Sequence, residues 1–174
     1  MIFMKLAASY VRVSTEEQAM RGYSIEAQRD AIQQYAKEVG RDKCFEMYGK
    51  LIQDIVKFIL DGKHPNLRLD DNGLLYSNGR NKAVTWMNST ANGKPVVPRS
   101  GYIVEFNALW YNTLKFSASM AAEKGDAKGA EKLETLAATV KKSFVDTFVN
   151  EYGYLLDYVD GNMMDWSVRP NMIF

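Results

Sequence analysis

The stretch DAKGAEKLETLAATVKKSFVDTF, residues 126–148, decides the fold class of this chain. Apolar side chains recur in it at the three- and four-residue spacing of one helix face, at Leu133, Leu136, Ala137, Val140, Phe144 and Phe148. Asp126 precedes this face, and its carboxylate can accept a hydrogen bond from a free backbone N–H of the first turn. The pattern therefore predicts an amphipathic helix that buries one face in a core.

Two further helices are expected upstream of this one. Residues 102–124 should form a helix whose inward side chains are Phe106, Leu109, Trp110 and Leu114. The segment from Cys44 to Asp61-Gly62 should form another, with its apolar face at Phe45, Tyr48, Leu51, Ile52, Ile55 and Ile59. Residues 67–87 carry turn signals at 70–73 and 77–79 and should pair as small strands, followed by a long loop to Gly101. Residues 152–174 have a loop-like pattern.

Composition limits the function classes. The chain has 174 residues, 47% of them hydrophobic, which favours one globular domain, and its formal charge of +1 provides no field for nucleic acid or an anionic membrane. Cys44 and His64 are each the sole residue of their type, so we expect no disulfide framework, no metal site and no cofactor. Without a membrane span or secretory signal, a cytoplasmic protein is expected.

Residues 85–112 combine aromatic rings with polar side chains. A polyhydroxylated sugar ring, apolar on its faces and rich in donors and acceptors at its edge, is held by such a mixture. This stretch therefore predicts one wall of a sugar pocket. The candidate binding residues in it are Trp86, Asn88, Arg99, Asn107, Trp110 and Tyr111.

The same stretch resembles the C-terminal glucosidase domain of glycogen debranching enzymes, the amylo-alpha-1,6-glucosidase family. The resemblance covers residues 44–174 and includes Tyr48-Gly49-Lys50, Asn72-Gly73-Leu74-Leu75-Tyr76 and Arg169-Pro170-Asn171. It implies a mainly α fold, a partial (α/α)6 toroid of the six-hairpin glycosidase type, and it adds Arg169 and Asn171 to the candidate binding residues. It also implies hydrolysis of α-1,6 branch points in glycogen-type glucans.

An inverting glycosidase needs a carboxylic acid and a carboxylate about 6.5–9.5 Å apart. Where many relatives have Trp-Met-Asp, this chain has Trp86-Met87-Asn88, and an asparagine cannot act as a general acid. Glu105 is the nearest alternative acid, although a first-turn glutamate also simply favours the helix dipole. Trp110 at helical spacing is either core or platform, and Arg99 is expected to be exposed. With this catalytic set incomplete, we expect no hydrolysis by the chain as it stands.

The first forty residues have a different resemblance. Residues 10–18 and 22–29 are similar to the amino end of the catalytic domain of serine recombinases, the resolvase and invertase family, over residues 4–40. By that resemblance Ser14 would be the nucleophile and Arg12 would hold the phosphate of DNA. The local pattern predicts a strand over residues 5–13 and a helix from Ser24 to Gly40, a short βα fragment. We therefore expect two parts, residues 1–43 and residues 44–174.

Three functions follow as expectations. The first is an incomplete α-1,6-glucosidase whose partner is a branched α-glucan or oligosaccharide. The second is DNA strand exchange through Ser14, and the third is a helical module that binds oligosaccharide without cleaving it. Because so few helices leave apolar stripes uncovered, Leu133, Val140, Phe144 and Phe148 are not all expected to be buried, and self-association through them is expected.

Overall fold

The computed structural model describes residues 25–79 and 81–173. The chain separates into two compact units, Met1–Lys50 and Leu51–Phe174. The predicted strand at residues 5–13, together with Arg12 and Ser14, lies outside the described residues. Helix α2, Ile25–Leu60, is broken at Gly40, whose φ of 67° and ψ of 169° are not helical. Glycine tolerates this conformation because it has no Cβ, so the predicted stop at Gly40 is a break between two helical segments.

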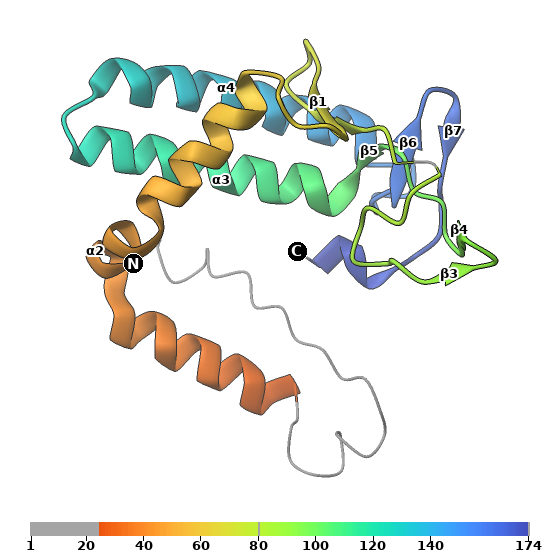
Figure 1. The fold of residues 1–174 in the computed structure, drawn as a ribbon, viewed down its shortest axis with the longest axis horizontal. Helices are drawn as coiled ribbons and strands as arrows, with labels where there is room; N and C mark the ends of the chain where they lie inside the picture. The colour runs from red at the N-terminus through yellow and green to blue at the C-terminus, as the bar shows by residue number, and fades with distance from the viewer. Residues whose placement is uncertain (1–24, 80, 174) are drawn as a thin grey trace. The chain divides into compact units, whose positions relative to one another are not determined.

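Helices α3, Val104–Glu123, and α4, Ala127–Phe148, lie antiparallel and side by side (Figure 1). The predicted N-cap is confirmed, because Asp126 Oδ1 accepts a hydrogen bond from the backbone N–H of Gly129 at 2.9 Å. A tight turn of Lys124 and Gly125 joins the helices, and Gly125 has a φ of +80°. This helical hairpin is the scaffold on which the other elements of Leu51–Phe174 pack.

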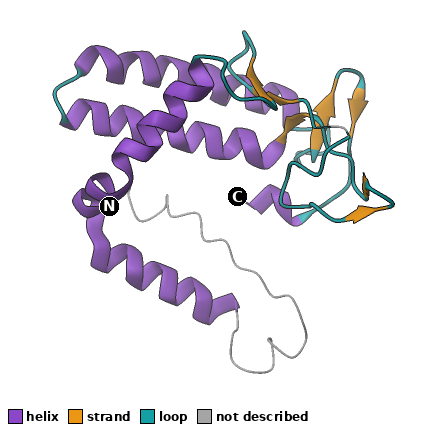
Figure 2. Cartoon of the chain, in the orientation of Figure 1, coloured by secondary structure: helices purple, strands orange, loops and turns teal. Residues whose placement is uncertain are grey.

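Short strands gather at one end of the hairpin (Figure 2). Five of them form an antiparallel sheet in the order β1-β2-β5-β6-β7, with bounds Leu67–Leu69, Leu75–Ser77, Gly101–Ile103, Tyr158–Asp160 and Met163–Met164. A separate hairpin is formed by β3, Thr90–Ala91, and β4, Lys94–Pro95. The chain ends in a 3-10 helix, η2, Pro170–Ile173. The small strands predicted around the turn at residues 70–73 are confirmed.

The strand β5 corrects the prediction that a helix begins at residue 102. Gly101 has a φ of +80°, and a Cβ at this position would lie 2.2 Å from the carbonyl oxygen of Val159. Only glycine allows β5 and β6 to approach this closely, and the helix begins after Ile103. The loop-like prediction for residues 152–174 is also wrong, since these residues supply β6, β7 and η2.

The core lies between the helical hairpin and the sheet. Its buried side chains are Val56, Leu74, Leu75, Val104, Trp110, Leu114, Ala137, Val140, Phe148, Leu156 and Val159. On the α4 stripe, Val140 and Phe148 are fully buried, while Leu133 and Phe144 are partly buried and pack against the core, so the four are not all buried, as expected. Self-association through this stripe stays a prediction. The β1–β2 turn covers Val140, whose Cγ2 would lie 3.2 Å from a Cβ on Gly73.

Two predicted inward faces are only partly correct. On α3, Phe106 is half-buried and Leu109 is 42% exposed, while Asn107 is buried instead. On α2, Ile52 and Ile59 pack against the core, but Leu51 and Ile55 are exposed. The described residues thus combine three helices with an antiparallel sheet, and the toroid stays a prediction. Among residues 25–79 and 81–173, no helix is both long and apolar enough to cross a membrane.

The ion pair of Arg68 with Asp70, at the end of β1, should make the free energy of unfolding sensitive to acid. Hydrogen bonds from Arg68 hold the pKa of Asp70 below its usual range, against the effect of burial, and Tyr102 donates a further bond. A carboxyl group whose pKa is lower in the folded than in the unfolded protein stabilises the fold at pH values above its unfolded pKa of about 3.9. This contribution is lost as the pH falls through the pKa of the folded state. We expect Asp70→Asn to lower the free energy of unfolding at pH 6. Below about pH 4 the free energy of unfolding of this variant should fall less steeply than that of the unmodified chain.

Urea unfolding at pH 6, 4 and 3 measures this effect. Asp71→Asn is the matched control, because Asp71 is the exposed neighbour in the same turn. An equal change in acid sensitivity for the two variants would contradict the assignment to Asp70.

Candidate functional site

Arg99 is the centre of a buried charge network. Its side chain is 1% exposed, which corrects the expectation of a solvated charge. Both guanidinium Nη atoms donate to Glu105, Nη1 to Oε1 at 2.5 Å and Nη2 to Oε2 at 2.6 Å. Nη2 also donates to Asp157 Oδ1 at 3.0 Å, and Nε lies 2.9 Å from Asp157 Oδ2. Two carboxylates offset the cost of burying this guanidinium.

Asp157 is the residue on which the network converges, and the sequence analysis missed it. It is fully buried and accepts hydrogen bonds from Arg99, Arg169 and Asn171. Its backbone is fixed too, since its carbonyl accepts from Val104 N–H and its N–H donates to the carbonyl of Asp165. A signal was present in the sequence: an aspartate inside the apolar run 154–159 is buried and must have a partner.

Arg169 connects this network to the chain end. It donates to Asp157 and, at 2.9 Å, to Asp165. Burial lowers the pKa of Arg169, but Asp165 and Asp157 outweigh it, and the net pKa is raised. Burial likewise raises the pKa of Asp165, while hydrogen bonds from Ser167 and Arg169 bring it below the usual range. Arg169 and Asp165 therefore remain oppositely charged within the segment after β7, and the bond from Arg169 to Asp157 joins this segment to the residue before β6.

Trp86 lies at the outer edge of the same network. Its indole N–H donates to Asn171 Oδ1 at 2.9 Å, and Asn171 is 1% exposed. The Trp86 side chain is nevertheless 46% exposed, so its ring is held at one edge while its surface remains open. Asn88 is exposed two residues further on, just before β3. An exposed ring fixed in orientation by a buried partner is suited to stacking against an apolar sugar face.

Three other predicted binding residues lie apart from this edge. Asn107 is fully buried and exchanges hydrogen bonds with Leu75 N–H and C=O, so it holds β2. The indole N–H of Trp110, which is 3% exposed, donates to the carbonyl of Gly73 at 3.2 Å. Tyr111 packs against the core. The structure thus brings together Trp86, Arg99, Glu105, Arg169 and Asn171, and gives Asn107 and Trp110 structural contacts.

The network is built to position groups rather than to transfer protons. Both oxygens of Glu105 accept from Arg99, and both oxygens of Asp157 lie within bonding distance of arginine nitrogens. A general acid must hold its proton within reach of the leaving oxygen, and a general base must face the attacking water.

Within the described residues, no three His, Cys, Asp or Glu side chains lie close enough together to hold a metal ion.

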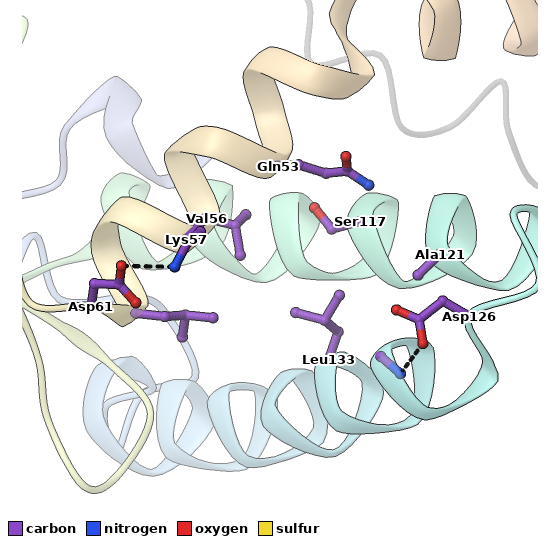
Figure 3. Close-up of a pocket in the computed structure, with 10 residues that line it drawn as sticks. Gln53, Val56, Lys57, Asp61, Ser117, Ala121, Asp126 and Leu133 are labelled. Carbon is purple, nitrogen blue, oxygen red and sulfur yellow. Dashed lines mark hydrogen bonds and ion pairs between the residues drawn. The ribbon is translucent and has the colours of Figure 1, made fainter.

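A groove of about 380 Å³ lies where the end of α2 passes α3 and α4, within Leu51–Phe174 (Figure 3). Its walls include Val56, Ala121 and Leu133. Its charged groups already have partners, because Lys57 pairs with Asp61 and Asp126 caps α4. The polar, uncharged side chains that line it are Gln53 and the buried Ser117, whose hydroxyl has no hydrogen-bond partner among the described residues.

Comparison with known proteins identifies the family. The family model described as amylo-alpha-1,6-glucosidase matches residues 23–174. The match begins before residue 44, so it includes part of the segment that was assigned to a separate recombinase-like part, and no comparison shows a relation to serine recombinases. A curated protein, "Uncharacterized immunity region protein 3" of Bacillus phage phi105, is 50% identical over 48 residues, which are 26% of this chain and 58% of the phage protein. No solved structure matches significantly. Since the family model covers most of its length, the chain belongs to the amylo-alpha-1,6-glucosidase family.

Proposed function

We propose that this region binds α-1,6-branched, glycogen-type glucan through a surface formed by Trp86 and Asn88, and that it does not hydrolyse the branch by itself. The first part is supported by the description of the family, amylo-alpha-1,6-glucosidase, because such an enzyme must bind an α-1,6-linked glucan. The second part adds a restriction that comes from the residues of this chain.

The position of Trp86 carries the binding proposal. Its ring is nearly half exposed, yet its N–H is tied to Asn171, which is in turn tied to Asp157 and, through it, to Arg99. A ring positioned in advance loses little side-chain entropy when a sugar stacks on it. Asn88, exposed beside it, has both a donor and an acceptor for sugar hydroxyls.

The restriction on hydrolysis follows from the carboxyl groups. Asn88 occupies the position of the acid that the family resemblance implies, and an amide cannot donate that proton. Glu105 and Asp157, the buried carboxylates of the network, are both engaged by Arg99. In the part of the chain that the structure describes, this site therefore lacks the pair of carboxyls that an inverting glycosidase uses.

The test measures binding and glucose release on the same preparation. We expect the full chain to bind a branched limit dextrin and to release no glucose from it. Trp86→Ala should weaken binding by about 1–2 kcal/mol, roughly fivefold to thirtyfold, as expected for loss of an aromatic anchor. Isothermal titration calorimetry gives the affinity, and a coupled glucose assay gives the release.

Trp166→Ala is the matched control, because Trp166 is 42% exposed and lies among other rings, Tyr152 and Tyr154. Its binding should equal that of the unmodified chain. Equal losses for the two variants would place the binding surface elsewhere. Glucose release that disappears in Glu105→Gln would make Glu105 catalytic and overturn the restriction.

A further inference from the structure

The sequence contains three asparagine–glycine pairs, Asn72-Gly73, Asn78-Gly79 and Asn92-Gly93. Asparagine is chemically labile in proteins, and a following glycine hinders its reaction least, because glycine has no side chain. In this reaction the backbone nitrogen of the glycine attacks the side-chain carbonyl carbon of the asparagine. The attack needs a free glycine N–H and a backbone that can rotate to bring the two atoms together. The surroundings of the three pairs differ in these respects.

Hydrogen bonds hold the first pair, Asn72-Gly73, in place. The side-chain oxygen of Asn72 accepts a bond from Leu74 N–H at 3.0 Å, and its Nδ2 donates to the Tyr102 hydroxyl at 3.3 Å. The Gly73 N–H, which would supply the nucleophile, donates to the carbonyl of Asp70 at 2.8 Å. Attack by this nitrogen therefore requires these bonds to break first.

Packing holds the second pair, Asn78-Gly79, in place. The Asn78 side chain is exposed, but Gly79 is buried. A Cβ on Gly79 would lie 2.2 Å from Val84 Cγ2, so the glycine backbone has little room to rotate. The backbone N–H of Asn78 also donates to the carbonyl of Asn66 at 2.9 Å. Ring closure at this pair would therefore disturb the packing around it.

The third pair, Asn92-Gly93, has neither kind of restraint. Both residues are exposed, and a Cβ on Gly93 would meet no atom within 4 Å apart from its chain neighbours. Among the described residues, the Asn92 side chain has no hydrogen-bond partner. The pair forms the turn between β3 and β4, with φ values of 51° and 75°, and each of these strands has only two residues. So short a hairpin opens at low cost, which lets the backbone reach the reactive conformation.

We propose that Asn92 is a site of spontaneous deamidation and that the fold selects it among the three pairs. The Gly93 nitrogen forms a bond to Cγ of Asn92, its proton leaves with Nδ2 as ammonia, and a cyclic succinimide results. Water then opens the ring at either carbonyl and leaves aspartate or isoaspartate. Both products carry a carboxylate, and isoaspartate lengthens the turn that joins Ala91 to Lys94 by one methylene, which weakens their pairing. The reaction needs only water, and the proposal does not rest on the proposed function.

The experiment ages the full chain at neutral pH and follows all three asparagines by peptide mapping with tandem mass spectrometry. We expect Asn92 to deamidate at least about tenfold faster than Asn72 or Asn78, because each ~1.4 kcal/mol of opening free energy slows a reaction tenfold. A methyltransferase specific for isoaspartate should label the aged chain. It should label Asn92→Gln aged in the same way far less, because a glutamine at this position does not form the five-membered ring.

Incubation in concentrated urea is the control for the role of the fold. The three pairs should then react at similar rates, because unfolding releases Gly73 from its hydrogen bond and Gly79 from its packing. Equal rates at the three asparagines of the folded chain, or a faster reaction at Asn72 or Asn78, would overturn the proposal. Selectivity for Asn92 that persists in urea would overturn it as well, since the neighbouring residues in the sequence would then explain the selectivity without the fold.

Discussion

Replacing Arg99 with methionine is expected to lower the free energy of unfolding by about 3–5 kcal/mol, the usual cost of removing one partner from a buried ion pair. Methionine retains much of the side-chain volume but none of the charge. Glu105 is 3% exposed and Asp157 is fully buried, so two carboxylates would lose their main partner away from water. The residual bonds of Asp157 to Arg169 and Asn171 offset only part of this loss.

Chemical denaturation at neutral pH measures the change. Lys142→Met is the matched control, because Lys142 pairs with Asp146 on the surface of α4 with side-chain exposures of 80% and 57%. Exposed pairs contribute about 0–1 kcal/mol, so this variant should be nearly as stable as the unmodified chain. Arg99→Lys should be intermediate, since an ammonium cannot reproduce the planar donor fork. A loss no larger than that of the control would show that the network does not support the fold.

The helical part of the fold was predictable because its signals are local. The spacing of apolar residues in 126–148 defines a helix, and Asp126 defines its start, so α4 followed from the sequence within a residue. The turn at residues 70–73 likewise predicted the β1–β2 pair. In each case the deciding interactions join residues that are close together in the chain.

The missed elements depend on partners that are distant in the chain. Strand β5 has only three residues and exists because β2 and β6 lie on either side of it. Residues 101–103 alone do not show this, and helical periodicity extended over them by default. The same holds for β6, whose partner β5 lies before α3 and α4. No spacing rule relates such segments.

Several residues that the sequence analysis selected lie together in the fold. Trp86, Arg99, Arg169 and Asn171 were predicted to bind sugar and Glu105 was the alternative acid, and their side chains belong to one network, while their contact with a sugar stays a prediction. Residue type does not reveal that Arg99 is buried, because that depends on Asp157, which lies immediately before β6 and is distant from Arg99 in the chain. The sequence therefore indicated which polar residues belong to this region. Only the fold shows which of them have buried partners and which remain exposed to a ligand.

Substitution of Trp110 tests most directly which residues support the fold and which contact the sugar. Trp110→Ala is expected to lower the free energy of unfolding by about 3–5 kcal/mol, because it leaves a cavity in the core and removes the bond to the Gly73 carbonyl. Trp110→Phe, which keeps an aromatic ring but loses the N–H, should cost less. Trp86→Ala should cost only about 1 kcal/mol, since it loses one hydrogen bond at a half-exposed position.

The two tryptophans should therefore show opposite behaviour when stability and dextrin binding are measured on the same variants. Trp86→Ala should lose binding with little loss of stability. Trp110→Phe should lose stability with little loss of binding, measured well below its unfolding midpoint. If Trp110→Phe weakened dextrin binding as much as Trp86→Ala does, then Trp110 would contact the sugar, and its burial against the β1–β2 turn could not be the state that binds glucan.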